Sequence, residues 1–212
     1  MEEETRLLYC ISSHPSDRYK YAVMDYDYYM IESVSCGKCG RTTQRLHLLY
    51  WPPKIRLEGG KRYPDCLSVS VPFEDRCGII VSERALTVFQ KEQLSGFEAA
   101  PIEVSGIEPD TPRYYYLTVT GSVSLDYHVM HYRKKSLCPD CGSFIWSRQK
   151  IGASVLNYAS WDGSDFCKLV DYPNFFLFTP KAVDIIRANK LNGFMMRMDS
   201  EIFLPLKGVK IC

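Results

Sequence analysis

Two CxxCG motifs decide how we expect this chain to fold: Cys36-Gly-Lys-Cys39-Gly40 and Cys138-Pro-Asp-Cys141-Gly142. They lie far apart, with 98 residues between Cys39 and Cys138 (138 − 39 − 1 = 98). Four thiolates in two such pairs match the tetrahedral coordination that Zn²⁺ requires, and the two-residue gap lets both sulfurs of a pair reach one ion. The following glycine can turn so that its amide faces a thiolate. We therefore predict one Zn²⁺ bound by Cys36, Cys39, Cys138 and Cys141.

Redox-active pairs and disulfides are the two alternatives for these cysteines. A thioredoxin-like pair opens a helix within a βαβ pattern, whereas neither motif here precedes a clear amphipathic helix. Disulfides need an oxidising compartment, and the N-terminal Met-Glu-Glu-Glu-Thr-Arg lacks the basic and apolar regions of a signal peptide. We therefore favour zinc and expect a cytoplasmic location. Four cysteine ligands leave no open position for a catalytic water, so the predicted role of the metal is structural.

The composition indicates a folded protein with a balanced charge. The chain has 212 residues, of which 46% are hydrophobic and 13% aromatic, enough for a substantial core. Its 26 Lys and Arg nearly balance its 25 Asp and Glu, whereas a dedicated nucleic-acid binder usually carries a basic excess. No apolar run approaches the roughly 18 residues that span a bilayer. We therefore expect no membrane association and disfavour nucleic acid as a partner.

Segments rich in aromatic and β-branched residues are predicted to form strands. Tyr19–Ile31 is expected to contain one or two strands, turned at Asp25–Asp27. Tyr114–Thr120 is the clearest strand, and Val123–Tyr132 continues after it with partial alternation. Glu103–Arg113 contains two prolines and a glycine and is predicted to be a short connector.

Two strand–helix segments resemble each other, Ile79–Phe97 and Phe176–Phe194. In each, an apolar strand runs into a residue suited to the N-cap, Ser82 or Thr179. Each helix then ends at Leu-x-Gly-Phe, where the glycine is expected to take the left-handed C′ conformation. Apolar residues recur at helical spacing between cap and glycine (Ala85, Leu86 and Phe89; Ala182, Val183 and Ile186).

The helices and the CxxCG motifs recur at nearly the same interval. The two glycines are 97 residues apart (193 − 96 = 97), and the first cysteines of the motifs are 102 apart (138 − 36 = 102). Such a period suggests duplication of a module of about 100 residues. The alternative is that a strand, a helix cap, a helix and a terminal glycine follow one another in many unrelated segments. The predicted fold is α+β, mostly antiparallel, with two packed helices and a zinc-ribbon-like clip of four cysteines. We expect one domain, 1–212, built from similar halves at approximately 1–104 and 113–212.

Little other chemistry is visible in the sequence. The nucleophile elbow, the phosphate-binding loop, the dinucleotide fingerprint and the HExxH motif are all absent. Basic residues near the two motifs are a weak signal for nucleic acid. The remaining cysteines follow no ligand spacing and are expected to be mostly buried free thiols: Cys10, Cys66, Cys77, Cys167 and Cys212.

The order of these features resembles the double-CxxCG motif proteins, which are numerous in myxobacteria and are grouped with immunity proteins of polymorphic toxin systems. The similarity covers roughly residues 20–200 and is one of pattern, carried mainly by the motifs at Cys36–Gly40 and Cys138–Gly142. The myxobacterial members are rich in Gly, Pro and Arg, whereas this chain is rich in Tyr, Lys and Ile.

This resemblance implies a non-catalytic protein that binds and neutralises a cognate toxin domain, with a structural Zn²⁺. Tyrosine suits such binding because it offers a large contact area at modest entropic cost, so Tyr26–Tyr29 and Trp51 are candidate anchors. Packing within the core is the alternative role, and we expect it for at least half of them. A zinc-ribbon protein that binds nucleic acid or regulates another process is the alternative.

Overall fold

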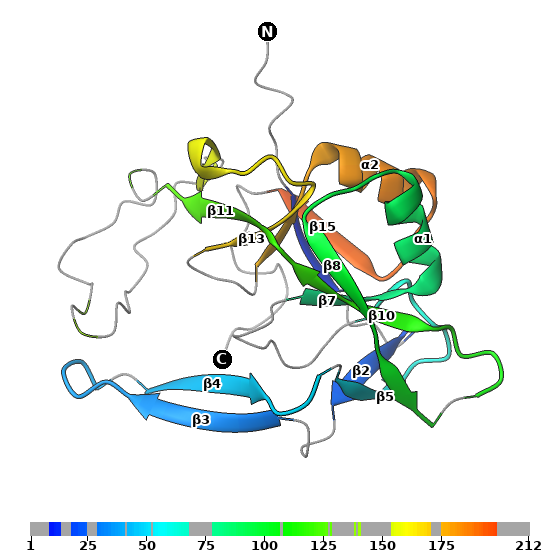
Figure 1. Cartoon of the computed structure of the whole chain (residues 1–212), viewed down its shortest axis with the longest axis horizontal. Helices are drawn as coiled ribbons and strands as arrows, with labels where there is room; N and C mark the ends of the chain where they lie inside the picture. The colour runs from blue at the N-terminus through cyan, green and yellow to red at the C-terminus, as the bar shows by residue number, and fades with distance from the viewer. Residues whose placement is uncertain are drawn as a thin grey trace, which may run out of the picture.

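The computed structural model describes residues 9–13, 18–24, 29–40, 42–51, 53–67, 78–106, 108–126, 128, 138, 140, 154–170 and 175–198. Within these residues the fold is α+β, with two helices and mostly antiparallel strands (Figure 1). This agrees with the fold class predicted from the sequence. None of the described helices is long and apolar enough to cross a membrane.

The elements fall into two sets that divide between β9 and β10. The first half comprises β1 (Tyr9–Ser13), β2 (Lys20–Met24), β3 (Tyr29–Ser35), β4 (Thr42–Leu48), β5 (Lys54–Gly59), β6 (Cys66–Leu67), β7 (Gly78–Ser82), α1 (Glu83–Lys91), β8 (Phe97–Pro101) and β9 (Glu103–Ser105). The second half comprises β10 (Tyr114–Val119), β11 (Gly121–Leu125), β12 (Leu156–Asn157), the 3₁₀ helix η4 (Tyr158–Ser160), β13 (Phe166–Leu169), β14 (Phe176–Phe178), α2 (Pro180–Ala188) and β15 (Phe194–Met198).

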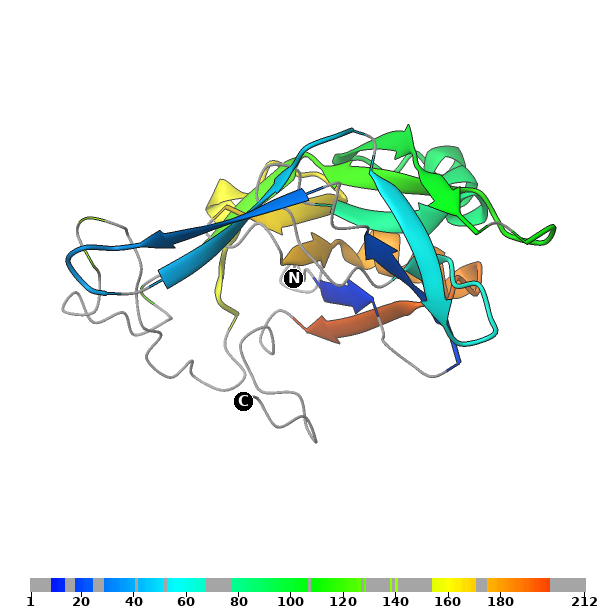
Figure 2. The same ribbon diagram turned by 90° about the horizontal axis from the view of Figure 1, so that it is seen from below.

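The strands form four hydrogen-bonded groups. A six-stranded sheet has the order β12-β11-β13-β14-β1-β15, a four-stranded sheet β6-β7-β10-β8, and a three-stranded sheet β2-β5-β9. Among the described residues, the strands β3 and β4 pair only with each other, and they form a ribbon that projects from the body (Figure 2). The pairs β11–β13 and β5–β9 are parallel, and the other pairs are antiparallel.

The predicted strands are found with adjusted limits. Tyr19–Ile31 contains β2 and the start of β3, and Tyr114–Thr120 corresponds to β10. The predicted continuation Val123–Tyr132 corresponds in part to β11, which begins earlier, at Gly121. The expected connector Glu103–Arg113 contains β9, which pairs with β5. That strand was missed because its pairing partner is about 50 residues away, and propensity within a window cannot register such a partner.

Both helices begin at the predicted caps. The Ser82 hydroxyl accepts a hydrogen bond from the Ala85 amide (3.2 Å), and the Thr179 hydroxyl accepts one from the Ala182 amide (3.3 Å). These bonds satisfy one of the amides that the first turn of each helix leaves without an intrahelical partner.

The ends of the helices differ from the prediction. The left-handed C′ residues are Gln93 and Lys190, with φ of 53° and 50°. The next amide, of Leu94 or Leu191, donates to the carbonyl five residues earlier, as in a Schellman motif. Glycine at C′ was therefore a wrong prediction, because the chain accepts the left-handed strain at a non-glycine residue in both helices.

The glycines of the two Leu-x-Gly-Phe segments have another role. Gly96 and Gly193 have φ of +89° and +85°, and a Cβ on either would lie 2.2 Å or 2.3 Å from a carbonyl oxygen of the opposite half, that of Phe166 or Cys66. Only glycine permits both this backbone conformation and this close approach.

One core unites the two helices. The apolar faces of α1 and α2 pack into a single cluster together with β-strand residues from both halves. Phe89 lies at its centre, with ring centroids 5.2 Å from Phe166 and 6.3 Å from both Phe97 and Phe194. Two smaller clusters lie under β2–β5 and under β11–β12.

Candidate metal centre

The first CxxCG motif forms the tip of the β3–β4 ribbon. Ser35 and Thr42 are the last cross-strand pair, and their hydroxyl oxygens are 2.9 Å apart. Beyond them the chain turns tightly, because the Gly40 amide donates to the Cys36 carbonyl at 2.9 Å. Gly40 has a φ of +69°, the left-handed conformation that favours glycine. The motif spacing thus places both cysteines on one compact loop.

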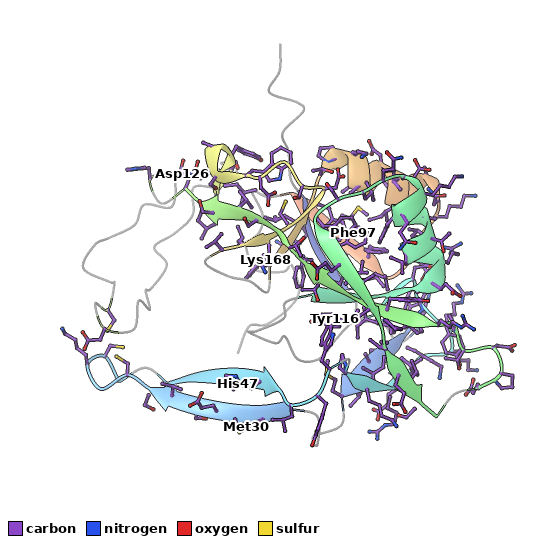
Figure 3. The ribbon with its side chains drawn as sticks, viewed as in Figure 1. Met30, His47, Phe97, Tyr116, Asp126 and Lys168 are labelled. Carbon is purple, nitrogen blue, oxygen red and sulfur yellow. The ribbon has the colours of Figure 1, made fainter. Side chains whose placement is uncertain are left out.

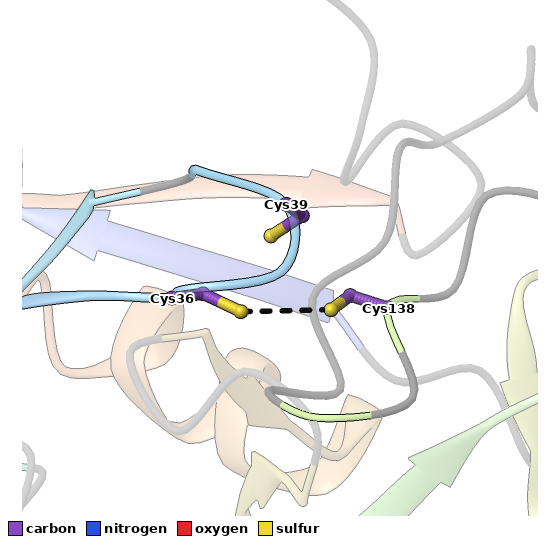
Figure 4. Close-up of side chains that lie close together, drawn as sticks. All are labelled: Cys36, Cys39 and Cys138. Carbon is purple, nitrogen blue, oxygen red and sulfur yellow. Dashed lines mark hydrogen bonds between the residues drawn. The ribbon is translucent and has the colours of Figure 1, made fainter.

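Three of the four predicted ligands come together at this loop. The thiol sulfurs of Cys36, Cys39 and Cys138 lie within 4.8 Å of one another, and Cys36 Sγ is 3.6 Å from Cys138 Sγ (Figure 4). Cys138 is buried, Cys36 is half-buried and Cys39 is exposed. Cys141, the fourth predicted ligand, lies outside the described residues.

This donor set fits a thiophilic metal ion. Sulfurs at about 2.3 Å from a tetrahedral centre are about 3.8 Å apart, close to the separation of Cys36 and Cys138. The three thiols could hold a metal ion, and among the described residues they are the one group of three His, Cys, Asp or Glu side chains close enough to do so.

An ion pair connects the two motifs beside the sulfurs. Lys38 Nζ lies 3.4 Å from Asp140 Oδ1, and both side chains are 56% exposed. Such an exposed pair contributes little stability. It does neutralise Lys38, a basic residue next to the thiols, and so weakens the case for a basic nucleic-acid surface there. The other basic residues near the motifs are outside the described residues or have undescribed side chains (Arg41, Arg45, Arg133, Lys134 and Lys135).

Two further cysteines are buried free thiols, as predicted. Burial raises the pKa of both Cys66 and Cys167 to about 12, so each stays protonated and unreactive at neutral pH. The Cys167 thiol also lies 3.1 Å from the Trp161 ring nitrogen and 3.2 Å from the Ser164 carbonyl. Cys77 and Cys212 lie outside the described residues, as does the side chain of Cys10.

Sequence reasoning missed a buried carboxylate, Asp65, which is 5% exposed. Its oxygens accept hydrogen bonds from the Ser82 hydroxyl (2.8 Å), from the Asn192 amide (2.9 Å) and from two nitrogens of Arg84 (3.0 and 2.7 Å). Burial raises the pKa of this carboxyl, but the hydrogen bonds from Arg84, Asn192 and Ser82 together outweigh burial and lower the pKa. Asp65 therefore joins the cap of α1 to the end of α2.

Asp165 makes the corresponding contacts in the second half. It is 8% exposed and accepts from the Thr179 hydroxyl at 2.9 Å and from the Ser95 amide at 3.0 Å. Lys181 Nζ lies 3.5 Å from Oδ2. Asp165 therefore joins the cap of α2 to the end of α1. A signal was present in the sequence: the variable residue of each Leu-x-Gly-Phe segment, Ser95 or Asn192, is polar, and each contacts one of these carboxylates.

A surface cavity of about 420 Å³ lies next to Asp65. Its lining includes Glu83, Arg84 and Arg113, and Glu83 and Arg113 form an ion pair at 3.7 Å. Asp65 and Arg84 also form an ion pair with each other. The charged side chains named here therefore neutralise one another within the protein.

The candidate partner-binding aromatics are placed only in part. Trp51 is half-buried, and its ring packs edge-on against that of Tyr116 with centroids 5.2 Å apart, so it contributes to the core. Tyr26 and Tyr28 lie outside the described residues, as does the side chain of Tyr29.

Other apolar side chains are exposed near the base of the ribbon. Met30 and Ile31 are each 50% exposed on β3, and Leu49 and Tyr50, just after β4, are 51% and 63% exposed. These four residues are called the ribbon patch below. Figure 3 shows Met30 and His47 on the ribbon, away from the main body.

Comparisons with known proteins identify no relative: the chain matches no protein-family model and no curated protein.

Proposed function

We propose that this protein is a non-catalytic immunity protein that binds and neutralises a cognate bacterial toxin domain in the cytoplasm. The observation that carries the proposal is the convergence of thiols from two CxxCG motifs that lie about 100 residues apart in the sequence. The paired motifs are the most specific part of the resemblance to the double-CxxCG immunity proteins, and their convergence supports treating them as one site.

The metal in this proposal is one structural Zn²⁺ held by Cys36, Cys39, Cys138 and Cys141. The all-sulfur donor set and the 3.6 Å contact between two of the sulfurs support zinc. When bound, the ion would cross-link the tip of the β3–β4 ribbon to the second half of the chain. This cross-link would restrict the ribbon before any partner arrives, which lowers the ordering cost of binding.

The ribbon patch is the surface that we propose for toxin binding. Two adjacent residues of one strand, Met30 and Ile31, are both half-exposed although they point to opposite faces of the ribbon. Large apolar and aromatic side chains of this kind act as anchors at interfaces. The finer architecture that we propose is one domain of two similar halves that share the metal site.

Co-expression tests the immunity proposal. The full chain is expressed with the candidate toxin domain encoded next to it, and growth and co-purification are measured. We expect growth to be restored and a stable complex to form. Ile31→Ser and Tyr50→Ser should weaken rescue, while Val170→Ser, which changes another exposed apolar residue (59%) outside the patch, should not.

Failure of rescue by a folded, metal-loaded protein would contradict toxin neutralisation. Binding of a generic duplex or single strand with a steep salt dependence would instead support the nucleic-acid alternative. Metal analysis of the reduced protein should give one zinc per chain, and Cys36→Ser should lose it. Absence of zinc from freshly purified wild-type protein would remove the metal from the proposal without bearing on toxin binding.

A further inference from the structure

The two halves of the chain exchange their first strands. The first strand of the second half, β10, lies between β7 and β8 of the first half. The first strand of the first half, β1, lies between β14 and β15 of the second half. We infer that the gap between the strands flanking each helix is a recognition surface, and that the partner it fits is the first strand of a second copy of the same module. In this chain the two halves act as the two copies, so that each half receives the first strand of the other.

The register of the exchanged strands is the first support. Tyr115 of β10 pairs with Val81 and Pro101, and Tyr9 of β1 pairs with Phe178 and Met198. The partners of the two strands differ by the same interval, 97 residues (178 − 81 = 97 and 198 − 101 = 97). This interval holds at all five paired positions from Tyr9↔Met198 to Ser13↔Phe194.

The buried carboxylates are the second support, because their contacts cross between the halves in both directions. Asp65 accepts from the Asn192 amide, and the Cys66 amide donates to the Asn192 carbonyl (3.1 Å). In the other direction Asp165 accepts from the Ser95 amide, and the Phe166 amide donates to the Ser95 carbonyl (3.0 Å). Each half thus holds the end of the other half's helix by the same pair of bonds.

The pairs β2–β5 and β11–β12 extend the correspondence. Met24 pairs with Ile55 and Leu125 pairs with Leu156, and the two pairs differ by 101 residues on both strands (125 − 24 = 101 and 156 − 55 = 101). All four of these residues are buried.

The contacts between the CxxCG motifs join equivalent positions. Cys36 contacts Cys138, and Lys38 contacts Asp140, so each contact links residues that are 102 apart (138 − 36 = 102 and 140 − 38 = 102). A contact between a position and its own counterpart arises next to a two-fold axis. The proposed metal site therefore lies on the axis that relates the two modules.

Chance recurrence of common local motifs explains less of this correspondence between the two halves. A strand, a polar cap and an amphipathic helix can recur by chance in unrelated segments. That recurrence does not predict a shared register for a strand taken from the opposite half, nor reciprocal carboxylate contacts between distant segments. The strand exchange also does not depend on toxin binding.

Matched proline substitutions in the full chain test the exchange. Ile11 and Leu117 are the equivalent central residues of β1 and β10, since they pair with Met196 and Ala99 (196 − 99 = 97). Proline in a central strand removes a ladder hydrogen bond. Amide hydrogen exchange then reports which strands lose protection. We expect Ile11→Pro to reduce protection in β14 and β15 by on the order of tenfold more than in β7 and β8, and Leu117→Pro to do the reverse.

Loss of protection in the first half when Ile11 is replaced would overturn the exchange. If the proline variants do not fold, a cleavable full chain provides the answer. A protease site is inserted after Asp110, in the exposed connector, and the folded protein is cut. We expect the two fragments to elute together in native buffer and to separate only in denaturant, because each contains the central strand of the other's sheet. Separation in native buffer would refute the exchange.

Discussion

Asp65 and Asp165 make matching contacts in the two halves, but the cation next to each differs. Arg84 contacts both oxygens of Asp65 at 3.0 and 2.7 Å, whereas Lys181 reaches one oxygen of Asp165 at 3.5 Å. A guanidinium forms two parallel hydrogen bonds with a carboxylate, and an ammonium acts as a point charge. The backbone and hydroxyl contacts are therefore common to both carboxylates, whereas the contact with the cation differs.

The sheets of the two halves also differ. In the second half β11 pairs in parallel with β13, so the sheet runs on through six strands. In the first half, within the residues that the structure describes, β2 pairs with β5 and not with β6, and two separate sheets result. Gly121 accounts for the close approach in the second half, since an added Cβ there would lie 2.2 Å from the Phe166 carbonyl oxygen. The equivalent residue at the start of β2 is Lys20 (121 − 101 = 20), whose Cβ is incompatible with that approach.

The first half has a further reason to keep its sheets apart. Tyr114 and Tyr116 of β10 are buried in the cluster that lies between the four-stranded and three-stranded sheets. Two fully buried tyrosine rings occupy a large volume. Gly121 in the second half and the two buried tyrosines of β10 in the first half are therefore the residues to which we attribute the difference between the sheets.

Gly121→Ala is expected to have one of the two largest effects, together with Asp65→Ala. The new methyl group would collide with backbone and disrupt the β11–β13 pairing, so we expect a loss of about 3 kcal/mol in the free energy of unfolding. Urea denaturation followed by circular dichroism measures it. Lys20→Ala at the equivalent position is the control, and it should cost less than about 1 kcal/mol because it removes the contact of the Lys20 ammonium with the Tyr63 ring and introduces no clash. Equal effects at the two positions would contradict this explanation of the sheets.

Removal of each carboxylate tests whether the two halves differ in the stability that these contacts provide. Asp65→Ala leaves the Ser82 hydroxyl, the Asn192 amide and Arg84 without their acceptor, and we expect a loss of about 3 kcal/mol. Asp165→Ala should cost about 2 kcal/mol because its cation contact is weaker. Denaturation of both variants under the same conditions gives the difference. A larger loss for Asp165→Ala would show that the cation does not control the strength.

The contribution of Asp65 should depend on pH. Its pKa in the folded protein lies below the ordinary value of 3.8, so the unfolded chain binds a proton more readily. The stabilisation is therefore complete above the unfolded pKa and is lost as the pH falls through the folded pKa. Denaturation of wild type and Asp65→Asn between about pH 3 and pH 6 should show the two free energies converging toward low pH. A constant difference would exclude ionisation of Asp65 as the cause.

The smallest effects are expected from exchanging the cations. Arg84→Lys should lose, and Lys181→Arg should gain, no more than about 1 kcal/mol, because both side chains are more than half exposed. Thermal unfolding at low and high salt measures both changes, which should shrink as salt increases. Opposite signs at the two sites would confirm that the cation distinguishes them. A gain from Arg84→Lys would contradict the geometric account.

The helix caps and the cysteine cluster could be predicted from the sequence alone. Ser82 and Thr179 cap their helices as predicted, because a hydroxyl before an amphipathic run satisfies amides only three residues away. The motif spacing likewise predicted that Cys36 and Cys39 meet Cys138. The caps depend on contacts within a few residues, and the cysteine cluster depends on the geometry of metal ligands. Both can be predicted from short sequence motifs.

The features that connect the two halves depend on contacts between segments far apart in the sequence. The pairing of β1 with β14 and β15, the contact of Asp65 with Asn192 and the close approach at Gly96 all join segments more than 60 residues apart. The sequence predicts that Gly96 and Gly193 end their helices, whereas in the structure each allows a carbonyl group of the other half to approach closely. The sequence shows where a glycine gives the backbone extra freedom. It does not show which carbonyl group requires that freedom, because this group belongs to a distant part of the chain and approaches the glycine only on folding.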